Sequence, residues 1–455
     1  MHTRNSYLRR FVLGVGLLAA LCAAGASPAA RAQSKADLER DRNRGRAMLA
    51  LVRDYLREYY YDTTYRGMDL EARFKAAEAK IGEAQSLSQV LGVIAQAVTE
   101  LNDSHTFFIP PPRPVDVDYG WKMQAVGDAV YVTAVKPGSD AEAQGLKPGD
   151  EVLAVDGFRP TRPTLWKMEY NYAVLRPQPG KRVVVRSPDG QERELALKAR
   201  VEKLDKAVNL VQVFNEYEEE RDDEKKLPRF YQQGDGADAV FIWKLREFGF
   251  TDSKVDETIS KARRGKALVL DLRGNPGGAV KTLQRMLGYV FDRDVKLGEM
   301  KERKKSKQLV AKTRGGEKVF KGQLVVLVDG GSGSAAELFA RVVQLEKRGT
   351  VVGDRTAGAV MVSNVRPGLL GDVSSGNMIP YGLSVTIADI ILSDGQSLER
   401  VGVTPDVVLL PTAADLRDRR DPVLARAVEL AGGHLSPEKA GTLFPPEVEL
   451  KSTHD

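Results

Sequence analysis

A serine in the stretch Val325–Glu337 has the surroundings of a nucleophile. The sequence there runs Val-Val-Leu-Val-Asp-Gly-Gly-Ser-Gly-Ser-Ala-Ala-Glu, which predicts a buried strand over 324–328, a tight turn, and a helix over 335–345. A serine at such a strand-to-helix turn is exposed, and the backbone N–H groups of its neighbours point toward the group it attacks. Ser334 is therefore a candidate for acyl transfer. The same residues also fit a plain glycine-serine turn that caps a helix.

A proton acceptor for this serine is suggested by elimination among the four histidines. His2 lies in a leader-like segment, and His434 and His454 lie in a polar tail. His105 follows a predicted helix in the run Asn-Asp-Ser-His-Thr, beside other polar groups. Histidine is the best proton acceptor near neutral pH, although a lone histidine is more often structural.

A glycine-rich turn, Asp271–Gly278, follows another predicted buried strand, 267–271. Its sequence, Asp-Leu-Arg-Gly-Asn-Pro-Gly-Gly, exposes backbone N–H groups to a ligand. A phosphate-binding loop is the alternative, but the Gly-Lys-Ser/Thr of that motif is absent.

The elements around these residues alternate between strand and helix. Buried strands are predicted over 267–271, 324–328 and 350–353, with helices over 252–264, 279–291 and 335–345 between them, and further strands over 378–391. This pattern is typical of an α/β core whose strands are buried on both faces. Apolar residues at helical spacing from Lys35 to Leu101 predict a small helical subdomain before the core.

Short strands separated by glycine and proline turns predict a β-rich module over 119–201. Its stretch Val135–Gly157, with Gly-Leu-Lys-Pro-Gly-Asp before a strand ending Val-Asp-Gly, resembles a PDZ domain of the bacterial protease type. Such domains add an extended peptide, often a C-terminal one, to a sheet edge. Tyr119, Gly120 and Trp121 stand where that resemblance places the peptide-binding loop. Trp121 fits core packing equally well.

The first residues have the features of a secretory leader. Arg9 and Arg10 precede an apolar run over 11–24, and Ala30-Arg-Ala32 offers small residues for cleavage. The net charge of +6 includes four leader arginines, so the remaining chain is near neutral and nucleic acid is not an expected partner. The single cysteine, Cys22, also lies in the leader. No disulfide, metal site or cofactor is indicated, and no stable membrane insertion is expected after leader removal.

The PDZ-like module, the Asp271–Gly278 turn, the Ser-Gly-Ser-Ala-Ala-Glu run and Gly353-Asp-Arg-Thr-Ala-Gly358 occur in the order of peptidase family S41. The chain resembles this family of C-terminal processing and tail-specific serine peptidases over about 102–406. The resemblance implies a core of crotonase-like ββα units with an inserted PDZ domain. It also implies Ser334 as the nucleophile, and an oxyanion hole formed by Gly277 or Gly278 together with the N–H of Ala335.

One position departs from the processing branch of the family, which has a lysine general base after Thr-x-Gly. Here that position is Ala359, and a supporting glutamine is replaced by Ser363. The tricorn-like branch lacks the lysine and uses a histidine from a Ser-His pair, with a glutamate near a Gly-Val-x-Pro-Asp turn. Ser104, His105 and Glu399 match that pattern. By this resemblance to the tricorn-like branch, His105 would be the general base, and Ser104 and Glu399 would orient the site.

The sequence therefore predicts an exported serine endopeptidase, periplasmic or extracellular, that acts on unfolded or tail-presented proteins, possibly recognised by their C-termini. An inactive S41 fold that serves as a PDZ-containing scaffold is the alternative, and a hydrolase of small esters is a third class. The oligomeric state is left open. The expected parts are a signal peptide over 1–32, a helical subdomain over 33–114, a PDZ domain over 115–203, the peptidase core over 204–412, and a C-terminal helix and tail over 413–455.

Overall fold

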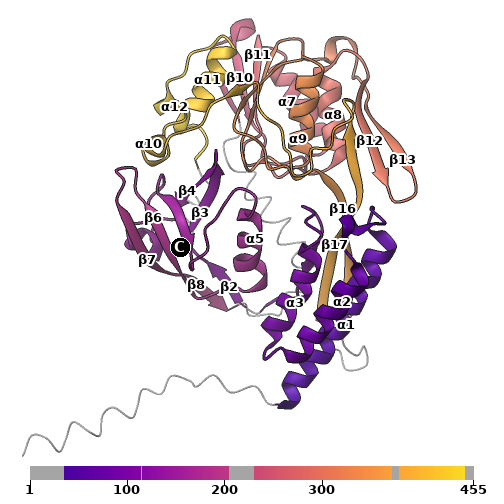
Figure 1. Cartoon of the computed structure of the whole chain (residues 1–455). Helices are drawn as coiled ribbons and strands as arrows, with labels where there is room; N and C mark the ends of the chain where they lie inside the picture. Colours follow the sequence, from indigo (N-terminus) through magenta and orange to yellow (C-terminus); the bar gives the residue numbers. More distant parts are fainter. Residues whose placement is uncertain (1–34, 114, 204–229, 371–378, 446–455) are drawn as a thin grey trace, which may run out of the picture.

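The computed structural model describes residues 35–113, 115–203, 230–370 and 379–445 (Figure 1). The predicted leader lies outside these residues. Among the residues that are described, no helix is long and apolar enough to cross a membrane.

A six-stranded sheet forms the centre of the core, in the order β18-β15-β14-β11-β10-β9. All neighbours except β9 and β10 are parallel. Their bounds are β9 Phe230–Gln233, β10 Val240–Lys244, β11 Ala267–Asp271, β14 Gln323–Val328, β15 Thr350–Gly353 and β18 Val407–Val408. Every residue of β11 is buried, as expected for a parallel strand covered on both faces. Asp271 pairs with Leu327, so the turns after β11 and β14 leave the sheet side by side.

Helices α7 (Asp252–Ala262), α8 (Val280–Val290) and α9 (Ala335–Leu345) pack on one face of this sheet, in a cluster that includes Ile259, Leu283 and Phe339. On the other face, α11 (Pro422–Leu430) packs against strand residues such as Val325. The sequence predicted α11 but not the flanking helices α10 (Ala413–Arg417) and α12 (Pro437–Gly441). Both are single short turns, begun by Thr412 and Ser436 side-chain caps that a loop could equally contain.

A second sheet extends from the core to the N-terminal helices (Figure 1). Its strands are β1 (Phe107–Ile109), β12 (Val295–Glu302), β13 (Ser306–Ala311), β16 (Met361–Leu370) and β17 (Ile379–Leu392). Short β1 pairs with the first part of β17, opposite Gly382–Ser384. The helices α1 (Lys35–Tyr59), α2 (Leu70–Glu83) and α3 (Leu87–Thr99) share one apolar cluster with Phe108, Leu383 and Val385. The N-terminal helices are thus packed onto a core strand.

The β-rich module is a five-stranded antiparallel sheet in the order β3-β4-β5-β6-β7. Its elements are β3 (Trp121–Val126), β4 (Ala129–Val135), α4 (Asp140–Ala143), β5 (Glu151–Val155), α5 (Leu165–Tyr170), η2 (Asn171–Leu175), β6 (Gly180–Arg186) and β7 (Glu192–Lys198). The chain enters and leaves through β2 (Val115–Asp118) and β8 (Arg200–Lys203), which pair with each other. Polar contacts tie the module to the core: Gln124 donates to Asp329, Arg162 forms an ion pair with Asp354, and the N–H of Gly127 donates to the same carboxylate. The predicted α/β core with helical and PDZ-like additions is confirmed.

Candidate active site

Ser334 stands at the first residue before α9 in a conformation that few residues adopt. Its φ is 50° and its ψ is −116°, so the backbone is left-handed without the freedom of a glycine. The N–H of Ser334 donates to the carbonyl of Ala359 at 2.9 Å, and the turn before it is held by the N–H of Gly333, which donates to Asn275 at 2.8 Å. The strand, tight turn and helix predicted around Ser334 are all present.

The glycine turn after β11 lies directly against Ser334. A Cβ atom at Gly277, whose φ is 111°, would lie 2.5 Å from the Cβ of Ser334 and 3.0 Å from the nitrogen of Ala335. The turn therefore needs glycine there. The N–H of Gly277 donates to the side-chain oxygen of Asn275 at 2.8 Å. Of the two glycines considered for an oxyanion hole, Gly278 is the one whose N–H has no intramolecular acceptor among the described hydrogen bonds.

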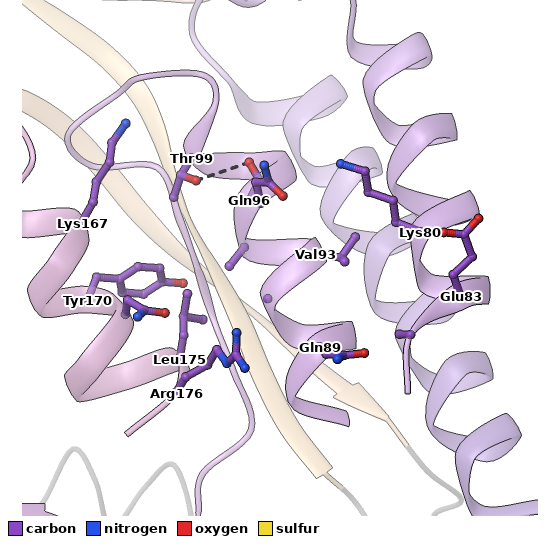
Figure 2. Close-up of a pocket in the computed structure, with 14 residues that line it drawn as sticks. Lys80, Glu83, Gln89, Val93, Gln96, Thr99, Lys167, Tyr170, Leu175 and Arg176 are labelled. Atoms are coloured by element: carbon purple, nitrogen blue, oxygen red, sulfur yellow. Dashed lines mark hydrogen bonds between the residues drawn. The ribbon is translucent and has the colours of Figure 1, made fainter. Parts of the chain in front are cut away.

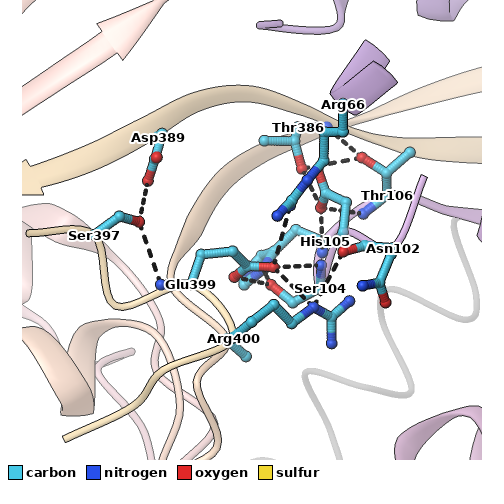
Figure 3. Close-up of polar contacts among 12 residues, drawn as sticks. Arg66, Asn102, Ser104, His105, Thr106, Thr386, Asp389, Ser397, Glu399 and Arg400 are labelled. Atoms are coloured by element: carbon cyan, nitrogen blue, oxygen red, sulfur yellow. Dashed lines mark hydrogen bonds and ion pairs between the residues drawn. The ribbon is translucent and has the colours of Figure 1, made fainter. Parts of the chain in front are cut away.

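Ser104, His105 and Glu399 form a continuous hydrogen-bonded chain (Figure 3). The Oγ of Ser104 lies 2.7 Å from Nδ1 of His105 and donates to Glu399 at 2.7 Å. The backbone N–H of Ser104 also donates to Glu399, at 2.9 Å. These contacts bring together three of the four predicted catalytic residues, from segments that are 295 residues apart in the chain.

Burial shifts the pKa values of Glu399 and His105 in this hydrogen-bonded chain. The Glu399 side chain is 4% exposed, and burial raises the pKa of its carboxyl group. Arg400 lies 3.4 Å and Arg66 lies 3.9 Å from the same carboxylate, which they approach from two sides (Figure 3). Burial also lowers the pKa of His105 below 6.5, because the surroundings disfavour the imidazolium and outweigh the opposing charge of Asp103. His105 is therefore neutral at pH 7.

Asp103 holds the turn that presents His105, and the sequence interpretation did not give it a role. Its carboxylate is buried and accepts hydrogen bonds from the N–H of His105 at 2.8 Å, the hydroxyl of Thr386 at 2.7 Å and the hydroxyl of Tyr60 at 3.0 Å. The carbonyl of His105 accepts from Ser384 at 2.7 Å. A buried carboxylate beside a candidate base is the signal that could have drawn attention to Asp103.

No hydrogen bond joins the His105 ring to Ser334 within the described part of the chain. The link between them runs through the backbone of two adjacent residues. The carbonyl of Ala359 accepts from the N–H of Ser334, and the N–H of Val360 donates to Glu399 at 3.0 Å. Ala359 thus contributes to this link through its peptide groups.

Tyr119, Gly120 and Trp121 lie at the start of β3, an edge strand of the module's sheet. The rings of Tyr119 and Trp121 pack against the module's core, and the ammonium of Lys181 lies 3.3 Å from the Tyr119 ring centroid. The N–H of Gly120 donates to Asp118 at 2.8 Å. This part of the loop is therefore already engaged by the module itself.

A cleft of about 510 Å³ lies between α2–α3 and the α5–η2 segment of the module (Figure 2). Figure 2 shows Gln89, Gln96 and Thr99 on one side and Lys167 and Tyr170 on the other. None of the predicted catalytic residues lines this cleft.

Comparison with known proteins identifies two domains in the chain. Residues 241–409 match the model of peptidase family S41, and residues 117–175 match that of the PDZ domain. The chain contains an S41 peptidase domain. His105 lies outside the matched S41 residues, whereas Ser334, Ala359 and Glu399 lie inside them.

Proteins similar to this chain include the carboxy-terminal processing protease CtpA of Bacillus subtilis, 26% identical over 287 residues, which are 62% of this chain and 53% of CtpA. The chloroplastic carboxyl-terminal-processing peptidase 2 of Arabidopsis thaliana is 24% identical over 366 residues, or 76% of this chain and 65% of the relative. The chain spans about half the length of several curated relatives that it matches. The structure of mature CPAF complexed with lactacystin covers 83% of this chain and 95% of its own, with a TM-score of 0.62 and 17% identity, so it shares the fold.

Proposed function

We propose that this chain is an exported serine endopeptidase that cleaves unfolded or tail-presented proteins, with Ser334 as nucleophile and His105 as general base. The observation that carries this proposal is the Glu399–Ser104–His105 hydrogen-bonded chain next to the strained Ser334 turn. The likeness to named processing proteases supports the reaction class. The alternative is an inactive fold that binds peptides through its PDZ domain, and the experiment below distinguishes it from an active peptidase.

The hydrogen bonds favour one tautomer of the base. An ionised Glu399 only accepts, so the single proton of the Ser104 hydroxyl is directed at it. The Ser104 oxygen then accepts from Nδ1–H of His105, which leaves Nε2 unprotonated. Nε2 of His105 takes the proton of Ser334 as its oxygen attacks the scissile carbonyl, and returns it to the leaving amine as the acyl-enzyme forms. Water then repeats these steps on the acyl-enzyme and releases the product acid.

The developing oxyanion would be stabilised by the N–H groups of Gly278 and Ala335. Neither donates to another described residue, whereas the N–H of Gly277 is taken by Asn275. Two fixed donors directed at a tetrahedral intermediate typically contribute a few kcal/mol each.

The PDZ module would deliver the substrate. We assign it to residues 115–203, between the helical subdomain and the peptidase core at 204–412. Tyr119, Gly120 and Trp121 would receive an extended peptide, with its C-terminus, at the edge strand β3. Residues 1–32 would direct export and then be removed. We also assign the chain to the tricorn-like branch of the family, which lacks the catalytic lysine.

The test is cleavage of an unfolded protein with an apolar C-terminus by purified wild-type chain and three variants. Ser334→Ala and His105→Ala should abolish cleavage and labelling by a serine-reactive fluorophosphonate while the melting temperature is kept. His434→Ala, in the tail, is the matched control and should behave as wild type. Full activity of His105→Ala would remove histidine from the mechanism. Peptide binding by the wild type without any labelling would favour the scaffold.

A further inference from the structure

The strained backbone of Ser334 must be held by its surroundings. A non-glycine residue at φ 50° and ψ −116° is strained, and this conformation persists only where neighbouring contacts determine it. The N–H of Ser334 is shared between two acceptors, the carbonyl of Ala359 at 2.9 Å and Oε2 of Glu337 at 3.0 Å. Glu337 lies one turn into α9 and is fully buried.

Glu337 has more partners than a helix cap requires. Oε2 accepts from the N–H groups of Ser334 and Ala359, the latter at 2.9 Å. Oε1 accepts from the N–H of Gly358 at 2.8 Å and from the hydroxyl of Thr356. Only the bond to Ser334 caps the helix. The other three bind a separate segment, 356–359, to the nucleophile's turn.

A matched cap elsewhere shows the difference. Asp415 occupies the same position of α10 and accepts from the N–H of Thr412 at 3.0 Å and from the Thr412 hydroxyl at 2.7 Å. The hydrogen bonds that its carboxylate accepts stay within that turn, and Arg420 forms an ion pair with it at 3.6 Å. Capping alone therefore does not require the contacts that Glu337 makes with Gly358 and Ala359.

The segment that Glu337 binds also reaches the base. Val360, the next residue, donates its N–H to Glu399, which in turn binds Ser104. Gly358 is enclosed on its other side by the loop that bears Glu399: the N–H of Arg400 donates to its carbonyl at 2.8 Å. Three consecutive peptide groups thus contact both the nucleophile's turn and the Glu399–Ser104–His105 chain.

We propose that Glu337 is a positioning residue that fixes Ser334 to the segment Gly358–Val360 and thereby sets the nucleophile's position relative to the base. This inference rests on the proposed peptidase function. In this inference Glu337 aligns Ser334 with the His105 ring, two groups that no described hydrogen bond joins directly. The four groups facing its oxygens are neutral donors, and burial raises its pKa to about 7, so no ion pair accounts for its presence.

Glutamine cannot reproduce these contacts, although its size is the same. It has one oxygen and one NH₂ group, so either the pair from Ser334 and Ala359 or the pair from Gly358 and Thr356 would face a donor instead of an acceptor. Glu337→Gln should therefore release one side of the link while filling the same volume.

The experiment compares Glu337→Gln with Asp415→Asn, the matched loss of a helix cap. Glu337→Gln should lower kcat and the rate of fluorophosphonate labelling by about 100-fold, with KM changed less than about threefold, since small misplacements of reacting groups act on kcat. Asp415→Asn should lower the melting temperature and leave kcat per folded molecule within about twofold. If Glu337→Gln does not fold, Thr356→Val, which removes one donor, should give a smaller fall in kcat with unchanged KM.

A crystal structure of Glu337→Gln supplies a readout that needs no activity. Ser334 should move out of its positive φ, or its N–H should separate from the carbonyl of Ala359. If Glu337→Gln is labelled at the wild-type rate and its Ser334 has not moved, the inference is overturned. If the wild type neither cleaves nor is labelled, the proposed function fails, and the position of Ser334 in the variant still decides the role of Glu337.

Discussion

The hydroxyl oxygen of Ser104 lies 2.7 Å from Nδ1 of its neighbour His105, while the proton of that hydroxyl is directed at Glu399. A serine thus stands where many hydrolases have a carboxylate against the imidazole. Glu399 is one side chain further away, so in the proposed mechanism it would orient the base through a neutral group. This arrangement makes the Ser104 hydroxyl a separate target for substitution.

Ser104→Ala should lower kcat by roughly 10- to 100-fold with little change in KM, because Nδ1–H loses its acceptor and the imidazole loses its fixed tautomer. Steady-state kinetics on an unfolded protein substrate would measure it. Ser187→Ala, in the turn between β6 and β7, is the matched control and should be silent. An equal effect of both variants would mean that Ser104 acts only on folding.

Activity should fall as the pH is lowered, with an apparent pKa below 6.5. Burial lowers the pKa of His105, so the neutral base persists at more acidic pH than for a free histidine, and protonation then removes the proton acceptor. A pH profile of kcat/KM and of fluorophosphonate labelling measures this limb. An acidic limb centred above pH 7 would contradict the assignment.

Gly277→Ala should abolish labelling of Ser334, because the added Cβ would lie 2.5 Å from the Cβ of that serine. Gly274→Ala is the matched control in the same turn. Its φ of 68° is also positive, yet nothing lies within 4 Å of the added Cβ. The control should lose about 1 kcal/mol of stability and keep most of its activity. Equal loss in both variants would trace the effect to backbone strain.

Asp271→Asn should destabilise the fold by roughly 3 kcal/mol, because it removes the counter-charge of Lys244 and one of the two carboxylates paired with Arg273, whose other partner is Asp421. Asp271 is fully buried between Lys244 at 3.3 Å and Arg273 at 2.8 Å, and these cations hold the pKa of its carboxyl group well below its usual range although burial opposes the shift. Urea unfolding would measure the loss. The exposed pair of Glu257 with Lys261 gives the contrast, and Glu257→Gln should leave the midpoint of urea unfolding nearly unchanged.

The sequence predicted best what depends on neighbours along the chain. The strand, turn and helix around Ser334 and the glycine turn at Gly277 follow from local patterns of apolar and small residues. The strand β10 was missed although its residues Val240–Trp243 are continuously apolar, and β12 and β13 were missed because lysine and glutamate residues interrupt their apolar pattern. Glu399 was found only through resemblance, since nothing local distinguishes it from a surface glutamate.

The roles of Glu337 and Asp103 could not be predicted from residue types. Both act by accepting backbone N–H groups, which every residue except proline carries, so no spacing of side chains reveals the contact. The contacts of Ala359 could not be predicted either. Its methyl side chain has no polar atom, but its carbonyl accepts from Ser334 and its N–H donates to Glu337.

The separation of Ser104 from Glu399 has a consequence for synthesis. The two residues are 295 positions apart, and β1 likewise pairs with the distant strand β17. During translation the base-orienting chain cannot assemble until residue 399 has left the ribosome. A nascent chain can therefore complete its PDZ module before this hydrogen-bonded chain forms, and under the proposed mechanism it would lack an oriented base during that interval.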